Sequence, residues 1–110
     1  MDVEERLSTY RSLADQYAVA KAQRGYLEDY KKSLLAMLMK DAERKKVVSV
    51  AGQERDALCR DEYAELIKGL QTAVHDEEKL RFHLKAVEWE IEIWRTKEAS
   101  QRAERRAYGA

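Results

Sequence analysis

Few side chains in this sequence are of the types that perform catalysis or bind metal ions. The two histidines, His75 and His83, lie eight residues apart. That spacing is too long for two side chains on one helical turn to share a metal ion. Cys59 is the only cysteine, so the chain forms no disulfide with itself and has no cysteine-based zinc site. We expect Cys59 to be a small, buried apolar residue.

The remaining acidic and glycine patterns do not predict an active site either. Glu88, Glu90 and Glu92 alternate around Trp89 and Ile91, and we expect them to form a solvated face or to pair with basic side chains of a neighbouring helix. A metal site is the alternative. The sequence contains no Glu-x-x-His, no Gly-x-Gly-x-x-Gly and no Walker-type phosphate loop. We therefore expect no catalytic residue, no metal, no cofactor and no enzymatic activity.

The composition is typical of long helices. The chain has 110 residues with 38% charged and 45% hydrophobic side chains, four glycines and no proline. A β-sandwich or barrel would need more turn residues. The formal net charge is zero, which does not indicate a globally basic nucleic-acid binder. No apolar stretch reaches the length of a membrane span and no secretory signal is visible. With its single cysteine, the chain is expected in the cytoplasm, away from membranes.

The apolar spacing predicts an all-α fold with one domain over residues 1–110: an antiparallel hairpin of two long helices, 2–45 and 61–106, with a turn and short helix over 46–60. We expect the chain to turn within residues 46–52, which group β-branched residues and end in Gly52. The short helix over 53–60 should bury Ala57, Leu58 and Cys59, and Asp61 should cap the next helix. The first helix has apolar residues at Val3, Leu7, Tyr10, Ala14, Tyr17, Ala20, Leu27, Tyr30, Leu34 and Met37. The last helix has them at Tyr63, Ile67, Leu70, Val74, Leu80, Leu84, Val87, Ile91 and Trp94.

Two charged residues interrupt these stripes. Arg24 takes an apolar position of the first helix, and Glu77 lies between Val74 and Leu80 in the last. A glutamate on a helix–helix seam commonly makes a local polar contact or sets the register.

The last helix has a second apolar face. At 100° per residue, Phe82, Ala86, Trp89 and Ile93 lie opposite the stripe that contains Leu84 and Val87. A single hairpin covers only one of these faces, and monomers rarely expose such a patch. We expect self-association through the second face, giving a four-helix bundle from two hairpins. Larger rings, a dedicated partner, or a cover formed by residues 47–60 are the alternatives.

Basic residues gather near the turn and at the C-terminal end. Residues 31–60 carry a net charge of +4 and residues 95–110 a net charge of +3. Cations near helix C-termini are favourable by themselves, and phosphate contact with nucleic acid is the alternative. The cluster near the turn comprises Lys40, Arg44, Lys45 and Lys46. The nucleic-acid candidates at the C-terminal end are Arg95, Lys97, Arg102, Arg105, Arg106 and Tyr108.

The last helix resembles a group of small helical phage and prophage proteins of unknown function. The resemblance lies in Leu66-Ile67-Lys68-Gly69-Leu70, in Leu80-Arg81 and above all in the run from Ile91 to Ser100. The first helix is similar more loosely, through Tyr26-Leu27 and Lys32-Ser33-Leu34-Leu35-Ala36. The genes of that group often lie near those for single-strand annealing recombinases and single-strand-binding proteins. The resemblance implies a viral protein in a host cytoplasm and transfers no residue role.

Two functions are therefore expected from the sequence. The first is a non-enzymatic, homo-oligomeric helical protein that serves as an interaction or assembly module. The alternative is an accessory protein of phage recombination or replication that binds DNA weakly or contacts a phage or host protein of those processes.

Overall fold

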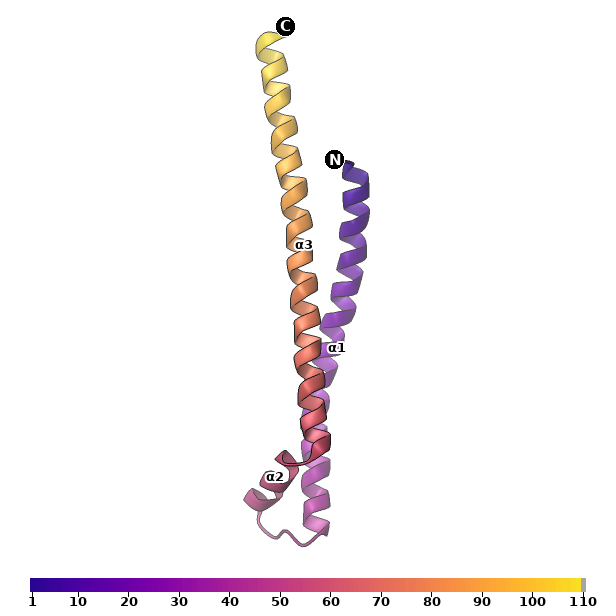
Figure 1. Ribbon diagram of the computed structural model, residues 1–110, viewed down its shortest axis with the longest axis vertical. Helices are drawn as coiled ribbons and strands as arrows, with labels where there is room; N and C mark the ends of the chain where they lie inside the picture. Colours follow the sequence, from indigo (N-terminus) through magenta and orange to yellow (C-terminus); the bar gives the residue numbers. More distant parts are fainter. Residues whose placement is uncertain (110) are drawn as a thin grey trace. The chain divides into compact units, whose positions relative to one another are not determined.

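The structure is a computed structural model that describes residues 1–109, and these residues form three helices and no strand. Helix α1 runs from Val3 to Arg44, α2 from Val50 to Leu58 and α3 from Asp61 to Tyr108 (Figure 1). The fold is thus all-α, as the composition predicts. Asp61, which was expected to cap the last helix, is the first residue of α3 itself.

Side chains and backbone cap the ends of α1. The Asp2 carboxylate accepts hydrogen bonds from the backbone N–H groups of Glu4 and Glu5, at 3.0 and 3.3 Å. At the other end, Lys46 has a φ of 72°. The N–H of Val47 donates to the Ala42 carbonyl at 3.1 Å. This is a Schellman ending with a lysine at the left-handed position, where glycine is commoner.

The chain turns at Lys46, within the expected segment 46–52, and Gly52 at the end of that segment lies in the first turn of α2. Ser49 caps α2 by accepting a hydrogen bond from the Gly52 N–H at 3.0 Å. A Cβ at position 52 would lie 2.8 Å from the Ser49 hydroxyl oxygen. Gly52 therefore leaves room for the cap rather than providing a turn.

Contacts divide the chain into two compact units, each of which takes part of α1 and part of α3. Residues 19–77 form one unit, and residues 1–18 with 78–109 form the other. The core of the first unit joins all three helices, because Leu34 and Leu38 of α1 pack with Ala57 of α2 and Leu66 of α3. Leu58 and Cys59 were expected to be buried too, but both are exposed. The short α2 turns one side inward, and each step of 100° carries the next residue away from Ala57.

Buried and half-buried residues recur along both long helices at alternating spacings of three and four. This spacing places Lys31 and Leu38 inward, whereas Tyr30 and Met37, expected inward, are exposed. In α3 it buries Ala73, while Val74 is 39% exposed. The inward positions of α1 are Val3, Arg6, Tyr10, Leu13, Tyr17, Ala20, Arg24, Leu27, Lys31, Leu34, Leu38 and Asp41. Those of α3 are Tyr63, Leu66, Leu70, Ala73, Glu77, Leu80, Leu84, Val87, Ile91, Trp94 and Glu98.

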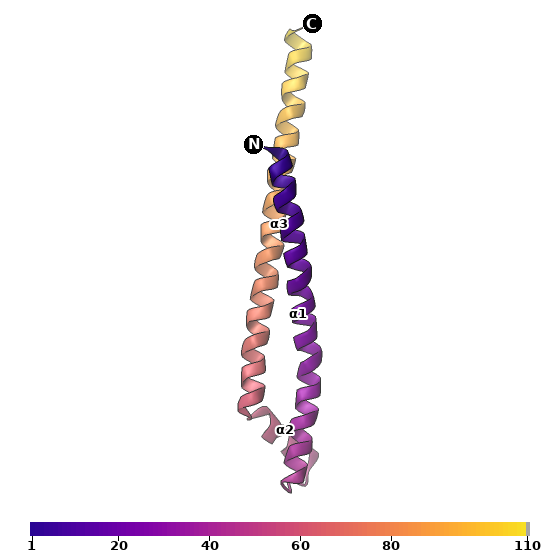
Figure 2. The same ribbon diagram turned by 90° about the vertical axis from the view of Figure 1, so that its right-hand side faces the viewer.

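In the unit formed by residues 1–18 and 78–109, the C-terminal part of α3 continues past the first residues of α1 (Figure 2). Every residue from 99 to 109 is exposed, so this extension has no packing partner within its unit. Among the described residues, no helix has the length and apolar character that a membrane span requires.

Candidate interaction surface

The face of α3 that the sequence predicts to be apolar is open to solvent. We call Phe82, Ala86, Trp89 and Ile93 the apolar face of α3. All four are exposed, with Trp89 at 67%, Phe82 at 58% and Ile93 at 56%. Residues 47–60 belong to the other compact unit, and nothing in this unit covers the face. The burial pattern therefore agrees with an apolar face that lacks a partner within its own unit.

The apolar face contains a shallow groove with mostly hydrophobic walls. Trp89, Ile93 and the stem of Lys97 line a volume of about 490 Å³, together with Glu92 and Thr96. At the other end of the face, the Arg81 guanidinium lies 4.8 Å from the centre of the Phe82 ring. This cation–π contact shields one side of the ring and leaves the rest of it exposed. Lys85, Glu90 and Glu92 flank the face and are exposed.

The opposite side of α3 contacts the start of α1. Val87 is 3% exposed, and Ile91 lies beside Leu7 and Tyr10 around one small pocket. Two opposite sides of the same stretch of α3 therefore differ in their exposure to solvent. The side with Val87 is packed, and the side with Trp89 is free.

Polar contacts fix this packed side of α3 against α1. Arg6 Nη2 donates to Glu90 Oε1 at 3.1 Å, and its Nε lies 2.8 Å from Glu90 Oε2. The Tyr10 hydroxyl donates to Glu88 Oε1 at 2.8 Å. This hydrogen bond and the negative charge of Glu88 raise the pKa of Tyr10. Glu88 and Glu90 thus pair with the neighbouring helix, which is one of the roles expected for the acidic run.

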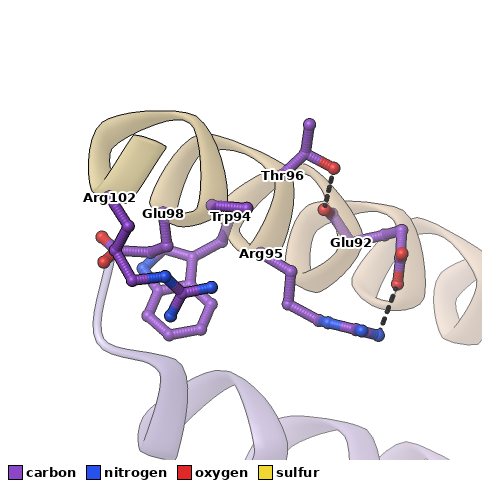
Figure 3. A pocket seen from close by; sticks show the side chains of 7 residues that line it. Glu92, Trp94, Arg95, Thr96, Glu98 and Arg102 are labelled. Carbon is purple, nitrogen blue, oxygen red and sulfur yellow. Dashed lines mark hydrogen bonds and ion pairs between the residues drawn. The ribbon is translucent and has the colours of Figure 1, made fainter. Parts of the chain in front are cut away.

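The arginines of the C-terminal extension share one side of α3. Arg95, Arg102 and Arg106 lie within about 40° of one another around the helix, and Arg105 lies about 60° from Arg102. Figure 3 shows Trp94, Arg95 and Arg102 pointing towards the start of α1. We call Arg95, Arg102, Arg105 and Arg106 the arginine stripe.

The other two nucleic-acid candidates differ in their place relative to this stripe. Lys97 lines the groove of the apolar face with Trp89 and Ile93. Tyr108, 91% exposed, lies about 60° from Arg105 and about 120° from Arg102 at 100° per residue. Tyr108 is therefore a surface neighbour of Arg105, at the edge of the arginine stripe, and lies on another side than Arg106.

An ion pair between a buried glutamate and a half-buried arginine lies on the seam of the unit formed by residues 19–77. Glu77 is only 6% exposed. Arg24 Nε donates to Glu77 Oε2, and Arg24 Nη2 donates to Glu77 Oε1 at 3.3 Å. Arg24 also donates to the exposed Glu28 at 2.8 Å. These carboxylates raise the pKa of Arg24 above its ordinary value. The two charged interruptions of the apolar stripes are thus partners.

A second exposed stripe, on α1, is a feature that our reading of the sequence missed. Val19, Tyr26, Tyr30 and Met37 lie on one side of the helix and are exposed. The rings of Tyr26 and Tyr30 stack with their centres 6.1 Å apart. The sequence indicates this stripe through spacings of seven, four and seven residues. Tyr30 and Met37 also fit the spacing of the inward stripe and were expected there.

The structure shows no centre with the composition of a metal site. Within residues 1–109, no three His, Cys, Asp or Glu side chains gather closely enough to hold a metal ion. The exposed Cys59 corrects the expectation of a buried thiol. The candidate surfaces are therefore the apolar face of α3, the arginine stripe and the α1 stripe. A comparison of the chain with protein-family models, curated proteins and solved structures found no match.

Proposed function

We propose that this chain is a non-enzymatic helical module that binds a second copy of itself through the apolar face of α3. One observation carries the proposal. Phe82, Trp89 and Ile93 expose more than half of their surface on one side of a helix whose other side is packed. Monomeric proteins seldom expose several large apolar side chains side by side. The non-enzymatic part rests on the absence of catalytic motifs from the sequence.

The proposal includes an antiparallel hairpin of α1 and α3. In one unit Arg6 pairs with Glu90 and Tyr10 with Glu88. In the other unit Arg24 pairs with Glu77, and Leu34 and Leu38 pack with Leu66. In both, a higher number on α1 goes with a lower number on α3, which supports an antiparallel arrangement. Two such hairpins would assemble into a helical bundle.

A second copy is the occupant that the flanking charges favour. The apolar face is bordered by both signs, with Lys85 next to Glu92 on one edge and Glu90 on the other. An identical face can therefore satisfy its own borders, as closed symmetric oligomers require. A strongly basic or acidic partner would leave part of each border unpaired.

Substitution of Trp89 by glutamate tests the proposal. The variant places a charge in the apolar contact and should dissociate the oligomer, because burying an unpaired charge is strongly unfavourable. Sedimentation velocity at micromolar concentration should show an oligomer for the wild type and a monomer of unchanged helicity for Trp89→Glu. Val48→Glu is the matched control, since Val48 is 91% exposed outside the helices. A monomeric wild type contradicts the proposal.

DNA binding is a second candidate function, supported by the arginine stripe. Arg102, Arg105 and Arg106 lie on the exposed extension of α3, and no ion pair holds them among residues 1–109. The resemblance to phage proteins supports a role near recombination or replication, in a host cytoplasm. Fluorescence anisotropy with labelled DNA distinguishes this function from assembly alone.

A further inference from the structure

We propose that two copies pair their apolar faces antiparallel, about a two-fold axis level with residues 87 and 88 of α3. This inference rests on the proposed self-association and assigns its orientation and register. In this arrangement Phe82 contacts Ile93 of the partner subunit, and Ala86 contacts Trp89 of the partner subunit. Each contact occurs twice because the axis exchanges the two copies.

The spacing of the apolar face defines a continuous seam along the outer side of α3. Phe82, Ala86, Trp89 and Ile93 follow spacings of four, three and four. The same period extends outward through His75 and Lys79 on one side and through Thr96 and Ser100 on the other, and all four are exposed. These polar residues limit the apolar part of the seam to Phe82–Ile93. A dimer whose helices are shifted along the seam would therefore place Trp89 against a lysine or threonine of the other copy.

The sizes of the central residues favour the antiparallel orientation. Opposite Trp89, an antiparallel partner places the small Ala86, and large and small side chains at facing positions pack without a void or a clash. A parallel, in-register pair would instead place Trp89 against the partner's Trp89 and Ala86 against the partner's Ala86. The parallel pair therefore crowds one layer and leaves a gap in the next.

Charge supports the same orientation. A parallel pair would bring Lys79 against the partner's Lys79 and would bring together two C-terminal segments of net charge +3. The antiparallel pair separates both. It also places Lys85 opposite the partner's Glu92, because residues on one edge of an antiparallel pair face the same edge of the other helix. In a parallel pair the flanking residues would also have opposite charges. The choice between the two orientations therefore rests on the packing of Ala86 and Trp89 and on the charges at the ends of the seam.

Disulfide trapping tests the orientation. The exposed Cys59 is first replaced by serine, and single cysteines are introduced as His75→Cys and Ser100→Cys. In the antiparallel pair position 75 faces position 100 of the other copy. The two copies of position 100 are then about 37 Å apart along the axis, far beyond the reach of a disulfide. A mixture of the two variants should yield a mixed dimer on oxidation, and Ser100→Cys alone should not.

The controls separate the orientation from self-association itself. Under reducing conditions, sedimentation velocity and circular dichroism establish that each variant is folded and oligomeric. Mixing Glu54→Cys with Ser100→Cys gives the background from random collisions, because Glu54 is an exposed residue of α2. The mixed 75–100 dimer should exceed this background about tenfold, as expected for cysteines held at disulfide distance.

Each remaining outcome overturns a distinct statement. A disulfide between two Ser100→Cys chains shows a parallel pair. An oligomer without any disulfide above background shows another register, and both results overturn this inference while the proposed self-association survives. A monomer in the reducing experiment, found also for the wild type, contradicts the self-association instead.

Discussion

Two charged residues on the seam between α1 and α3 bear most directly on how these helices align. Arg24 and Glu77 interrupt two apolar stripes, and each satisfies the other. Glu77 is buried, so the loss of Arg24 would leave its carboxylate without its main partner, whereas Arg24 is half-buried and keeps Glu28 as a second partner. The pair therefore acts as a register device, because only one alignment of the two helix segments brings Arg24 to Glu77.

Removal of Glu77 tests this role. Glu77→Ala should lower the thermal midpoint by about 5 °C or more, because the buried side chain of Glu77 and both of its hydrogen bonds from Arg24 are lost. The double variant Arg24→Leu with Glu77→Leu should recover the wild-type midpoint or exceed it. Glu28→Ala is the control, since Glu28 is an exposed partner of the same arginine and surface pairs contribute little. Equal losses for Glu77→Ala and Glu28→Ala would refute the assignment.

At the scale of elements, the sequence predicts which segments are helical better than which way their sides face. The two long helices are evident because no proline and few glycines interrupt them. The inward side was misassigned where an apolar residue lies next to the true position. Tyr30 and Met37 are apolar neighbours of the inward Lys31 and Leu38. A lysine on the seam cannot be recognised from its type, because its long stem packs while its ammonium reaches water.

The turn and the short helix show the same limit. The turn lies within the predicted segment 46–52, but its left-handed residue, Lys46, could not be predicted from its type because glycine is commoner at that position. The apolar face of α3 could be predicted because its four apolar residues lie on one side of the helix, opposite an uninterrupted stripe of inward apolar residues. The side on which each arginine of the extension lies follows from helix geometry alone, and the same geometry places Tyr108 beside Arg105 but not beside Arg106.

The ion pairs that hold α2 give an element-scale prediction about acid. Asp41 on α1 accepts a hydrogen bond from Arg60 at 2.7 Å, and Lys45 Nζ lies 3.2 Å from it. These cations, Arg60 first, lower the pKa of Asp41 below its ordinary value of 3.8. The carboxylate thus stabilises the folded state above pH 3.8, and this contribution is lost as the pH falls through the lower folded-state pKa.

The variant Asp41→Asn should accordingly be less stable than the wild type near pH 7, and the difference should shrink as the pH falls below 3.8 and through the lowered pKa of Asp41 in the folded state. Urea unfolding followed by circular dichroism at several pH values measures the difference. Asp29→Asn removes one negative charge from an exposed position of the same helix and should track the wild type throughout. A gap between Asp41→Asn and the wild type that stays constant into the most acidic solutions, where Asp41 is protonated in both states, would show that charge is not the cause.

At the scale of the whole molecule, the net charge of zero restricts how DNA could be bound. A neutral chain exerts little long-range attraction on a polyanion, so binding would depend on local contacts. The arginine stripe is such a local site, and it follows the acidic residues Glu88, Glu90 and Glu92 along α3. In the proposed antiparallel dimer the two stripes lie at opposite ends, which allows one long strand to engage both.

We therefore expect weak DNA binding that depends steeply on salt. Each phosphate neutralised on a single strand contributes about −0.7 to the slope of log affinity against log salt concentration. Replacing Arg102, Arg105 and Arg106 by alanine should abolish binding at low salt, whereas alanine at Lys40, Lys45 and Lys46 should leave it intact. Anisotropy with single-stranded and duplex DNA, at low and physiological salt, measures both.

The variant Trp89→Glu tests whether assembly strengthens DNA binding. If both stripes of a dimer engage one strand, the monomeric variant should bind long strands more weakly but short oligonucleotides equally well. Absence of binding by the wild type at low salt removes the DNA function and leaves the assembly function untouched.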